Sequence, residues 1–476
     1  MNTEDVKMLL YRYRKVENAI KEIENGTFYF ASRKELNDPL EGYVRVYWKG
    51  DKAAWEGLLR NYICSTYHAI TMYLLAADED TLFHNTLIVD IHGFDTVPLG
   101  EVYKNLGDKF LEDIEVQQLT EFYGKRETKV QYDELRLMLQ FVHNKALVIC
   151  IKSCLECGLI PEDEGRNLLE IFEKREQSVL TEKIYQSFSD EVYDNFMVKY
   201  LKDVFEDMIE YQYIKRGLNS KVFLYGNTSS GKDKNETARQ HRKWMIIEVD
   251  FPKIYVEQMK ELIYPEGFIV CFSGKNDDSA MWGKYADNHK GVCLIYETNE
   301  KQAIKIKLSN GFVSEKVKKV VYEGEVIERN FFETFGRLTY SQIKGWLTGS
   351  GGVSNCYEVF CNEEEWRKKY WDTFEAKNYR KLKDWEHEDE YRIVIDNTFY
   401  EYEEKESKII QYDLKSLKGI VFGINTTEYD KMRIVEKLLE KKDVFDDFTF
   451  YQAEYDDSKQ KIMVRKKEFW KLSEII

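Results

Sequence analysis

Residues 383–395 read KDWEHEDEYRIVI, and this stretch decides the fold expected for the last third of the chain. A short polar segment leads into the β-branched run Tyr391–Ile395, which predicts a helix end that feeds a strand. Because side chains alternate along a strand, a period of two brings Glu388, Glu390 and Arg392 to one face. Two carboxylates and a guanidinium are costly there without partners, so the sequence predicts either an internal ion-pair network or a polar ligand pocket.

Strand-like runs lie toward both ends of the chain, and a helical region separates them. The runs are Leu9–Tyr13, Thr27–Ala31, Gly267–Ser273, Gly291–Glu297, Val317–Tyr322, Ile409–Tyr412 and Gly419–Gly423. From residue 52 to residue 218 the apolar residues recur with the 3.6-residue period of helices, as in Glu101–Phe122 and Tyr132–Glu156. A helix is also expected at Val16–Glu24, closed by Gly26, where a positive φ is wanted. The sequence therefore predicts an α+β core interrupted by a large all-α insertion.

These patterns divide the chain into five segments. Residues 1–50 and 266–426 are the two parts of the α+β core, and residues 51–218 are the helical insertion. Residues 219–265 hold a polar loop and a connecting strand at Trp244–Val249. Residues 427–476 add a last helix and strand. A chain of 476 residues is long enough for two structural units or for one core with such an insertion.

Composition indicates a globular, intracellular protein. The net charge of -15 argues against a broad phosphate-binding surface, although a local basic groove remains compatible with it. The first ten residues, MNTEDVKMLL, carry acids and no long apolar stretch, so neither a signal peptide nor a membrane span is expected. The eight cysteines are expected to be reduced thiols. We therefore expect a cytoplasmic protein without a membrane partner.

Two local motifs suggest a phosphate-binding loop and an iron–sulfur site, and each motif has a simpler structural interpretation. Residues Gly226–Lys232 match the GxxxxGK phosphate loop, but Asp233 stands where a hydroxyl would hold magnesium, so a polar loop is favoured. Cys150, Cys154 and Cys157 have the spacing of an iron–sulfur motif, but within a helical pattern they fall at i, i+4 and i+7, as a core face does. The seven histidines are scattered along the chain, so no metal site is expected.

Four further segments form a more specific set. They are YRYR at 11–14, FYFAS at 28–32 with LNDPLE at 36–41, CFS at 271–273 with MWGKYADNHKGVC at 281–293, and KDWEHEDEYR at 383–392. Their order and residues resemble a bacterial family, domain of unknown function 2971, over about residues 8–45 and 265–425. The helical region between the two parts lies outside this resemblance.

The E-x-E-Y-R ending at Glu388 is also similar to the layout of ADP-ribosyltransferases and abortive-infection proteins. That resemblance implies a split ADP-ribosyltransferase-like β core and NAD as cofactor. The resemblance implies that Glu390 stabilises the oxocarbenium-like transition state as nicotinamide leaves. It also implies that Glu388 positions or deprotonates the acceptor and that Arg12 binds the pyrophosphate. The ligand-binding residues expected around them are Tyr11, Tyr13, Ser32, Asn37, Asp38, Glu41, Ser273, Trp282, Tyr285, His289, Lys383, Trp385 and Arg392.

Three functions follow as hypotheses. The first is an ADP-ribosyltransferase-like or NAD-cleaving protein, acting as a phage-defence or toxin effector. The second is a non-enzymatic sensor, in which the same pocket binds a nucleotide or small anion and the helical insertion contacts a protein partner. The third is a nucleic-acid-processing effector that uses a short basic cluster. The residues of that cluster are Lys232, Lys234, Arg239, Arg242 and Lys243.

Overall fold

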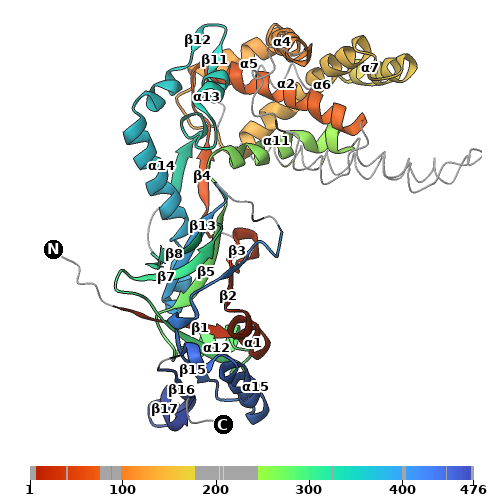
Figure 1. Cartoon of the computed structure of the whole chain (residues 1–476). Coiled ribbons are helices and arrows are strands. Elements are labelled where there is room, and N and C mark those ends of the chain that lie inside the picture. Colours follow the sequence, from red (N-terminus) through yellow and green to blue (C-terminus); the bar gives the residue numbers. More distant parts are fainter. Residues whose placement is uncertain are drawn as a thin grey trace, which may run out of the picture. The chain divides into compact units, whose positions relative to one another are not determined.

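The computed structural model describes two compact units, each built from several separate segments of the chain (Figure 1). Unit 1 takes residues 1–44, 265–327 and 371–476, and unit 2 takes residues 45–264 and 328–370. The residues described are 7–38, 41–74, 87, 98–176, 203, 207, 245–322, 326–398, 402, 404–445 and 447–472. Helices and several sheets occur together, so the mixed α+β class expected from the sequence is confirmed.

Unit 1 is organised around one large sheet, which in the described residues has nine strands in the order β17-β16-β15-β6-β1-β5-β13-β9, with β3 also paired to β5. Only the β15–β16 pair is parallel among these pairings. The strands are β1 (Leu9–Arg14), β3 (Ala31–Ser32), β5 (Gly267–Ser273), β6 (Val292–Glu297), β9 (Lys318–Lys319), β13 (Glu390–Asp396), β15 (Leu417–Phe422), β16 (Thr449–Asp456) and β17 (Lys461–Lys471). Most carry β-branched or aromatic residues, which suit a half-buried pleated surface.

The sheet opens between β1 and β5. Strand β1 pairs with β6 along its whole length, but it pairs with β5 only at Tyr11 and Ser273. Further along β5, strand β3 becomes the partner, with Ala31 opposite Ile269. The chain between β1 and β3 forms helix α1 (Val16–Asn25) and strand β2 (Thr27–Tyr29). The edge of β5 near Cys271 therefore faces an opening between the two strands.

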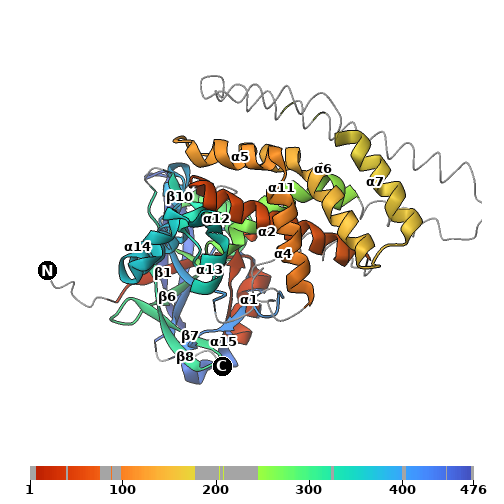
Figure 2. The ribbon, with the colours of Figure 1, turned by 90° about the horizontal axis from the view of Figure 1, so that it is seen from above.

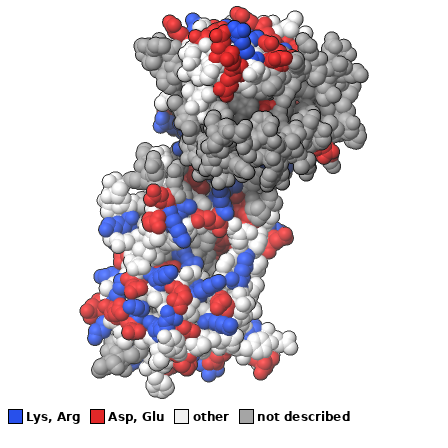
Figure 3. All heavy atoms as spheres, turned by 90° about the vertical axis from the view of Figure 1, so that its right-hand side faces the viewer, with Lys and Arg blue, Asp and Glu red and all other residues white. Residues whose placement is uncertain are grey.

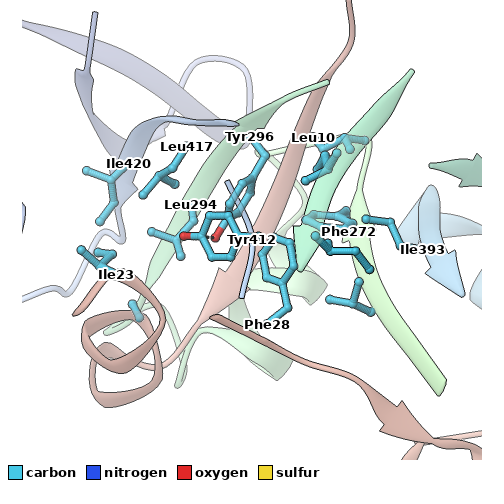
Figure 4. Packing of buried hydrophobic residues seen from close by; sticks show 14 of the residues in the cluster. Leu10, Ile23, Phe28, Phe272, Leu294, Tyr296, Ile393, Tyr412, Leu417 and Ile420 are labelled. Carbon is cyan, nitrogen blue, oxygen red and sulfur yellow. Dashed lines mark hydrogen bonds between the residues drawn. The ribbon is translucent and has the colours of Figure 1, made fainter. Parts of the chain in front are cut away.

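The two faces of the sheet carry separate apolar clusters. The larger one, drawn in Figure 4, joins Leu10, Phe28, Phe272 and other core side chains to α1 and to α15 (Glu428–Leu439). The smaller one joins Tyr13 to Trp282 of α12 (Ser279–Tyr285). Alternation along β1 explains the division: its even-numbered side chains face the larger cluster and its odd-numbered ones face α12.

Unit 2 is largely helical. Its described helices include α2 (Lys52–Leu74), α4 (Pro98–Leu111), α5 (Ile114–Lys125), α6 (Tyr132–Glu156), α7 (Glu162–Glu176), α11 (Phe251–Met259) and α13 (Tyr340–Trp346). Helix α2 contacts α4, α5 and α6, and Figure 2 shows these helices side by side. The hairpin β11 (Thr348–Gly349) and β12 (Gly352–Val353) also packs on α2. Residues 328–370, assigned to the core from sequence, thus belong to the helical unit.

The bounds of several elements agree closely with the sequence patterns. Helix α6 spans Tyr132–Glu156 and strand β5 spans Gly267–Ser273, as predicted. Helix α1 ends at Gly26, whose φ of 60° is the left-handed conformation expected there. Strand β13 begins one residue before the predicted run and ends one residue after it. Periodicity was reliable at these positions because burial and local preference agree there.

Three expectations for the fold are wrong. The segment Ile246–Asp250 is a π-helical turn (η2) that continues into α11, not a strand, because Ile246 packs against the helical residue Ile254. The single helix expected at residues 101–122 is broken at Asp113, whose carboxylate accepts the N–H of Glu115 at 2.9 Å and so caps α5. After α15 the chain forms two strands, β16 and β17, where one was expected.

Candidate functional site

A tight turn before β13 brings two carboxylates together. The 3-10 helix η6 (Lys383–Glu388) ends at Asp389, whose φ is 42°, and β13 starts at Glu390. The hydroxyl of Ser273 donates to the carbonyl of Glu388 at 2.8 Å and ties this turn to β5. Glu388 and Glu390 therefore reach the same neighbours although they belong to different elements.

Arg392 lies at the centre of a buried ion-pair network. Its Nε donates to Glu390 Oε1 at 2.8 Å, its Nη1 donates to the Asn378 carbonyl at 2.6 Å, and its Nη2 donates to Glu41. Burial lowers the pKa of Arg392 to about 9, against the opposing effect of Asp38, and the guanidinium is still charged at neutral pH. The ion-pair network expected from the sequence is thus present, with Glu41 as a partner.

Lys381 connects the three carboxylates of this network. Its Nζ donates to Glu388 Oε2 at 2.7 Å and to Glu390 Oε2 at 3.0 Å, and it lies 3.8 Å from Glu41 Oε2. Burial opposes the charge on Lys381, but Glu390 and Glu388 outweigh it and raise its pKa above the ordinary value. Burial raises the pKa of Glu390, while Lys381 opposes that shift. Arg392 and Lys381 thus provide two buried cations for three carboxylates.

Glu388 has a second set of partners on its other oxygen. Its Oε1 accepts the Tyr285 hydroxyl at 2.8 Å and lies 3.6 Å from Lys284 Nζ. The Tyr285 hydroxyl in turn accepts Asn37 Nδ2 at 2.6 Å. Burial, then Glu388, raises the pKa of Tyr285, so its hydroxyl remains a donor at neutral pH. Lys284 supplies the third cation, and the ring of Trp385 lies 3.7 Å from its Nζ.

A cavity of about 740 Å³ lies at the opening between β1, β3 and β5. One side carries the carboxylate and lysine group just described, since Glu388, Glu390 and Lys381 line it. The other side carries residues of β1, α1 and β2, among them Arg12 and Lys21. Ligand pockets of proteins commonly have volumes of roughly 300–1,000 Å³. The cavity is therefore large enough for a nucleotide-sized molecule.

Arg12 reaches the cavity from the sheet face opposite to Glu390. The register pairs Tyr11 with Ser273 and Ser273 with Glu390, so Tyr11 shares the face of Glu390 and Arg12 points to the other face. Arg12 is 5% exposed, and its guanidinium carbon lies 4.9 Å from the ring centre of Phe28. It therefore belongs to the same cavity as the ion-pair network but not to that network.

The structure brings many of the sequence-predicted site residues to one cavity. Those that line it are Tyr11, Arg12, Tyr13, Asn37, Glu41, Ser273, Tyr285, Glu388 and Glu390. Those outside its lining are Ser32, Asp38, Trp282, His289, Lys383, Trp385 and Arg392. Of these, Arg392 lies behind the wall and holds Glu390 and Glu41.

The remaining predicted residues outside the lining have structural neighbours. The amide N–H and hydroxyl of Ser32 both donate to Glu35 Oε2 at 2.8 Å, in a capping box. Trp282 is fully buried, its Nε1 donates to the Asn276 carbonyl at 2.9 Å, and its ring packs near His289. Asp38 is buried, whereas Lys383 is exposed on η6. These positions shape the turns and the core around the cavity.

The sequence patterns did not indicate Lys381, the buried lysine that binds Glu388 and Glu390. Lys383 opens the family-like segment but is exposed, whereas Lys381 is 2% exposed at its side chain and binds the carboxylates. Its position two residues before that segment was the available signal. Cys271 was quoted in the family-like segments but not chosen for the site, although it lies opposite Arg392 on β5 and lines the cavity.

Of the alternative motifs, the cysteine motif on α6 lies outside the lining of the cavity. In the described ranges no group of His, Cys, Asp and Glu could hold a metal ion. On α6, Cys150 and Cys154 are buried, and Cys157 is exposed at the helix end. The loop Gly226–Lys232 and the basic cluster up to Lys243 lie outside the described residues. None of the described helices combines the length and apolar character that crossing a bilayer requires.

Comparison with known protein families gives a match over part of the chain. Residues 281–393 match the family model described as "Protein of unknown function (DUF2971)". No curated protein and no solved structure matches the chain. The matched segment runs from α12 into β13 and contains Tyr285, Lys381, Glu388 and Arg392. Over the part that forms the carboxylate wall of the cavity, the chain is therefore similar to the DUF2971 family of proteins of unknown function.

Proposed function

We propose that unit 1 binds a nucleotide-like small molecule in the cavity between β1, β3 and β5. The observation that carries this proposal is the convergence of Glu388, Glu390 and Lys381 on the wall of one preformed cavity. Burying these charges costs free energy that apolar residues in the same place would not cost. Sites that recognise polar ligands justify such a cost, because fixed donors and acceptors give orientation and specificity.

The groups available to a ligand suit hydroxyls and an aromatic ring. Glu388 offers carboxylate oxygens, and Tyr285 and Asn37 offer a hydroxyl and an amide beside it. Tyr11 and Tyr29 also line the cavity and can contact the face of a base. This combination of a carboxylate with aromatic rings fits the ribose and base of a nucleoside.

Binding is tested by thermal shift and calorimetry with adenosine, guanosine, cytidine, uridine and their phosphates. We expect at least one compound to raise the melting temperature of the wild-type protein. Glu388→Gln should weaken that binding by about tenfold or more, since it removes a charge-assisted hydrogen bond. Glu386→Gln is the matched control, because Glu386 is exposed on the same short helix. The proposal would be rejected if none of the compounds raised the melting temperature of the wild-type protein and Glu388→Gln changed neither binding nor that temperature.

A second candidate is the cleavage of NAD by an ADP-ribosyltransferase-like core. The observation that favours it is a carboxylate pair at a cavity wall, with Glu388 Oε1 toward Tyr285 and Glu390 held by Arg392. A fixed carboxylate stabilises the oxocarbenium-like charge that develops as nicotinamide leaves. Arg392 donates to both oxygens of Glu390, whereas Oε1 of Glu388 accepts the Tyr285 hydroxyl, so Glu388 is the better candidate for this role.

NAD cleavage is tested by nicotinamide release, with and without phage components as activators. The expected result is release by the wild-type protein and loss of at least about a hundredfold in Glu388→Gln, the size of effect seen when a transition-state partner is removed. Glu386→Gln should retain the wild-type rate. Absence of nicotinamide under all conditions, with the nucleotide still bound, would leave the binding function and reject the enzymatic one.

A further inference from the structure

Arg12 is a buried cation with two nitrogen donors, Nε and Nη1, that are unused by the described residues. It is 5% exposed and lines the cavity, yet its Nε and Nη1 have no hydrogen-bond acceptor within the described ranges. A buried donor without an acceptor costs roughly 1–3 kcal/mol, and more when the donor is charged. Arg12 lines the cavity, so a molecule bound there is a candidate source of these acceptors.

The buried carboxylate of Glu22 forms an ion pair with Arg12 but lies too far away for a hydrogen bond. Glu22 accepts Arg14 Nε at 2.9 Å and the Tyr296 hydroxyl at 2.6 Å, whereas Arg12 Nη1 lies 3.6 Å from Glu22 Oε1. The guanidinium of Arg12 instead lies near the rings of Phe28 and Phe272. Those rings hold its orientation but accept no conventional hydrogen bond.

The charge balance on this side of the cavity is positive. Arg12, Arg14 and Lys21 line it, and Glu22 is the acid of α1 that contacts two of them. Glu35 also lines the cavity but accepts bonds from Lys408, Tyr29 and Ser32. The carboxylate wall, in contrast, carries its own matching cations. The cavity thus has a cationic side and a nearly neutral, polar side.

We propose that Arg12, Arg14 and Lys21 form a subsite for a phosphate or diphosphate group. Arginine suits this role because its planar guanidinium binds phosphate oxygens through paired N–H donors. The inference rests on the proposed function and adds the class of ligand and its orientation. The ligand is a phosphorylated, hydroxyl-bearing molecule whose phosphate lies toward β1 and α1 and whose hydroxyls lie toward Glu388.

The subsite is tested with three probes: inorganic pyrophosphate, adenosine and adenosine 5′-diphosphate. Calorimetry of the full chain should detect pyrophosphate, and the diphosphate should bind at least tenfold more tightly than adenosine. The double variant Arg14→Gln, Lys21→Gln should remove most of that difference, and Arg12→Gln should do the same if it folds. Lys15→Gln is the control, since Lys15 is an exposed cation between Arg14 and α1 that does not line the cavity.

The outcomes separate this inference from the function on which it rests. Equal binding of adenosine and its diphosphate, with no pyrophosphate binding, would overturn the subsite and leave the nucleotide-like ligand in place; Arg12 would then be hydrated by cavity water. An equal loss in Lys15→Gln would also overturn it, because it would indicate a general charge effect. If none of the three probes nor any other nucleoside binds, the proposed function itself fails.

Discussion

Arg392 and Lys381 are buried cations whose partners come from three separate parts of the chain. Glu41 and Arg392 are 351 residues apart, and both side chains are almost completely buried. A buried pair contributes little net stability relative to an apolar replacement, but removing one member leaves the other charge uncompensated. The network therefore holds the cavity wall in one geometry, but it makes the protein sensitive to single substitutions within the network.

The two neighbouring lysines allow this to be measured. Lys381→Met leaves Glu388 and Glu390 without their shared cation, and we expect a loss of about 3–5 kcal/mol in the free energy of unfolding. Lys383→Met changes the same charge at an exposed position and should cost less than about 0.5 kcal/mol. Urea unfolding followed by circular dichroism compares them. Equal effects would mean that the network is not buried as described.

The burial of Lys377 makes the stability of the folded protein depend on pH. Its Nζ is buried and donates to the Pro265 carbonyl at 3.4 Å. Burial, together with the charge of Arg33, lowers its pKa to about 7, and Glu266 and Asp396 oppose the shift. Between pH 7 and the ordinary lysine value the unfolded chain binds more protons than the folded one. Lys377 therefore makes stability rise with pH in that interval, by at most about 1.4 kcal/mol per pH unit.

The variant that isolates this contribution is Lys377→Met. Its stability relative to the wild-type protein should be highest at pH 7 and should fall steadily toward pH 10, as the wild-type protein recovers the cost of burying a charge. Urea midpoints at pH 7, 8, 9 and 10 give the difference curve. Parallel curves for the two proteins would show that Lys377 is not buried in this way.

At the scale of elements, a glycine of α2 allows α13, which belongs to residues 328–370, to pack closely against α2 within the helical unit. A Cβ at Gly57 of α2 would lie 1.9 Å from the Trp346 carbonyl oxygen of α13. Gly283 of α12 is also helical, but a Cβ there would meet nothing within 4 Å. The two positions differ in packing and not in local conformation.

Substitution by alanine should therefore have opposite effects at these two helical glycines. Gly57→Ala forces α2 and α13 apart and should cost at least about 2 kcal/mol. Gly283→Ala has no clash and gains helix propensity, so it should be neutral or stabilising by up to about 1 kcal/mol. Thermal unfolding checks both. A harmless Gly57→Ala would contradict the close approach of the two helices.

At the scale of the whole molecule, the chain crosses between two units that have separate cores. Because each unit has its own contacts, local stability should differ between them. Figure 3 shows acidic and basic side chains interspersed over the described atoms of one face, as expected for a solvated surface. A protein partner for the helical unit, a nucleic-acid role and a cytoplasmic location stay predictions from the sequence.

Hydrogen exchange tests the separation of the two units. Lys381→Met should speed amide exchange in β5 and β13 of unit 1 and leave α2 and α6 of unit 2 near the wild-type rate. Gly57→Ala should have the reverse pattern. Uniform changes over both units in either variant would mean that they unfold as one cooperative body.

The sequence by itself determined the local elements and much of the site. Periodicity alone predicted α6, β5 and β13, because each element is buried in the pattern that its own residues repeat. Alternation also predicted that Glu390 and Arg392 share a face of one strand.

Tertiary structure decided what local patterns do not contain. It selected Lys381 over Lys383, because only Lys381 is enclosed with the carboxylates. It turned Ile246–Asp250 into a helical segment, since Ile246 packs with residues of helices α11 and α2. It also opened the sheet between β1 and β5, so that Arg12 meets the cavity from the face opposite to Glu390. Each of these outcomes depends on which residues are enclosed together in three dimensions, and such burial and charge pairing leave no periodic trace in the sequence.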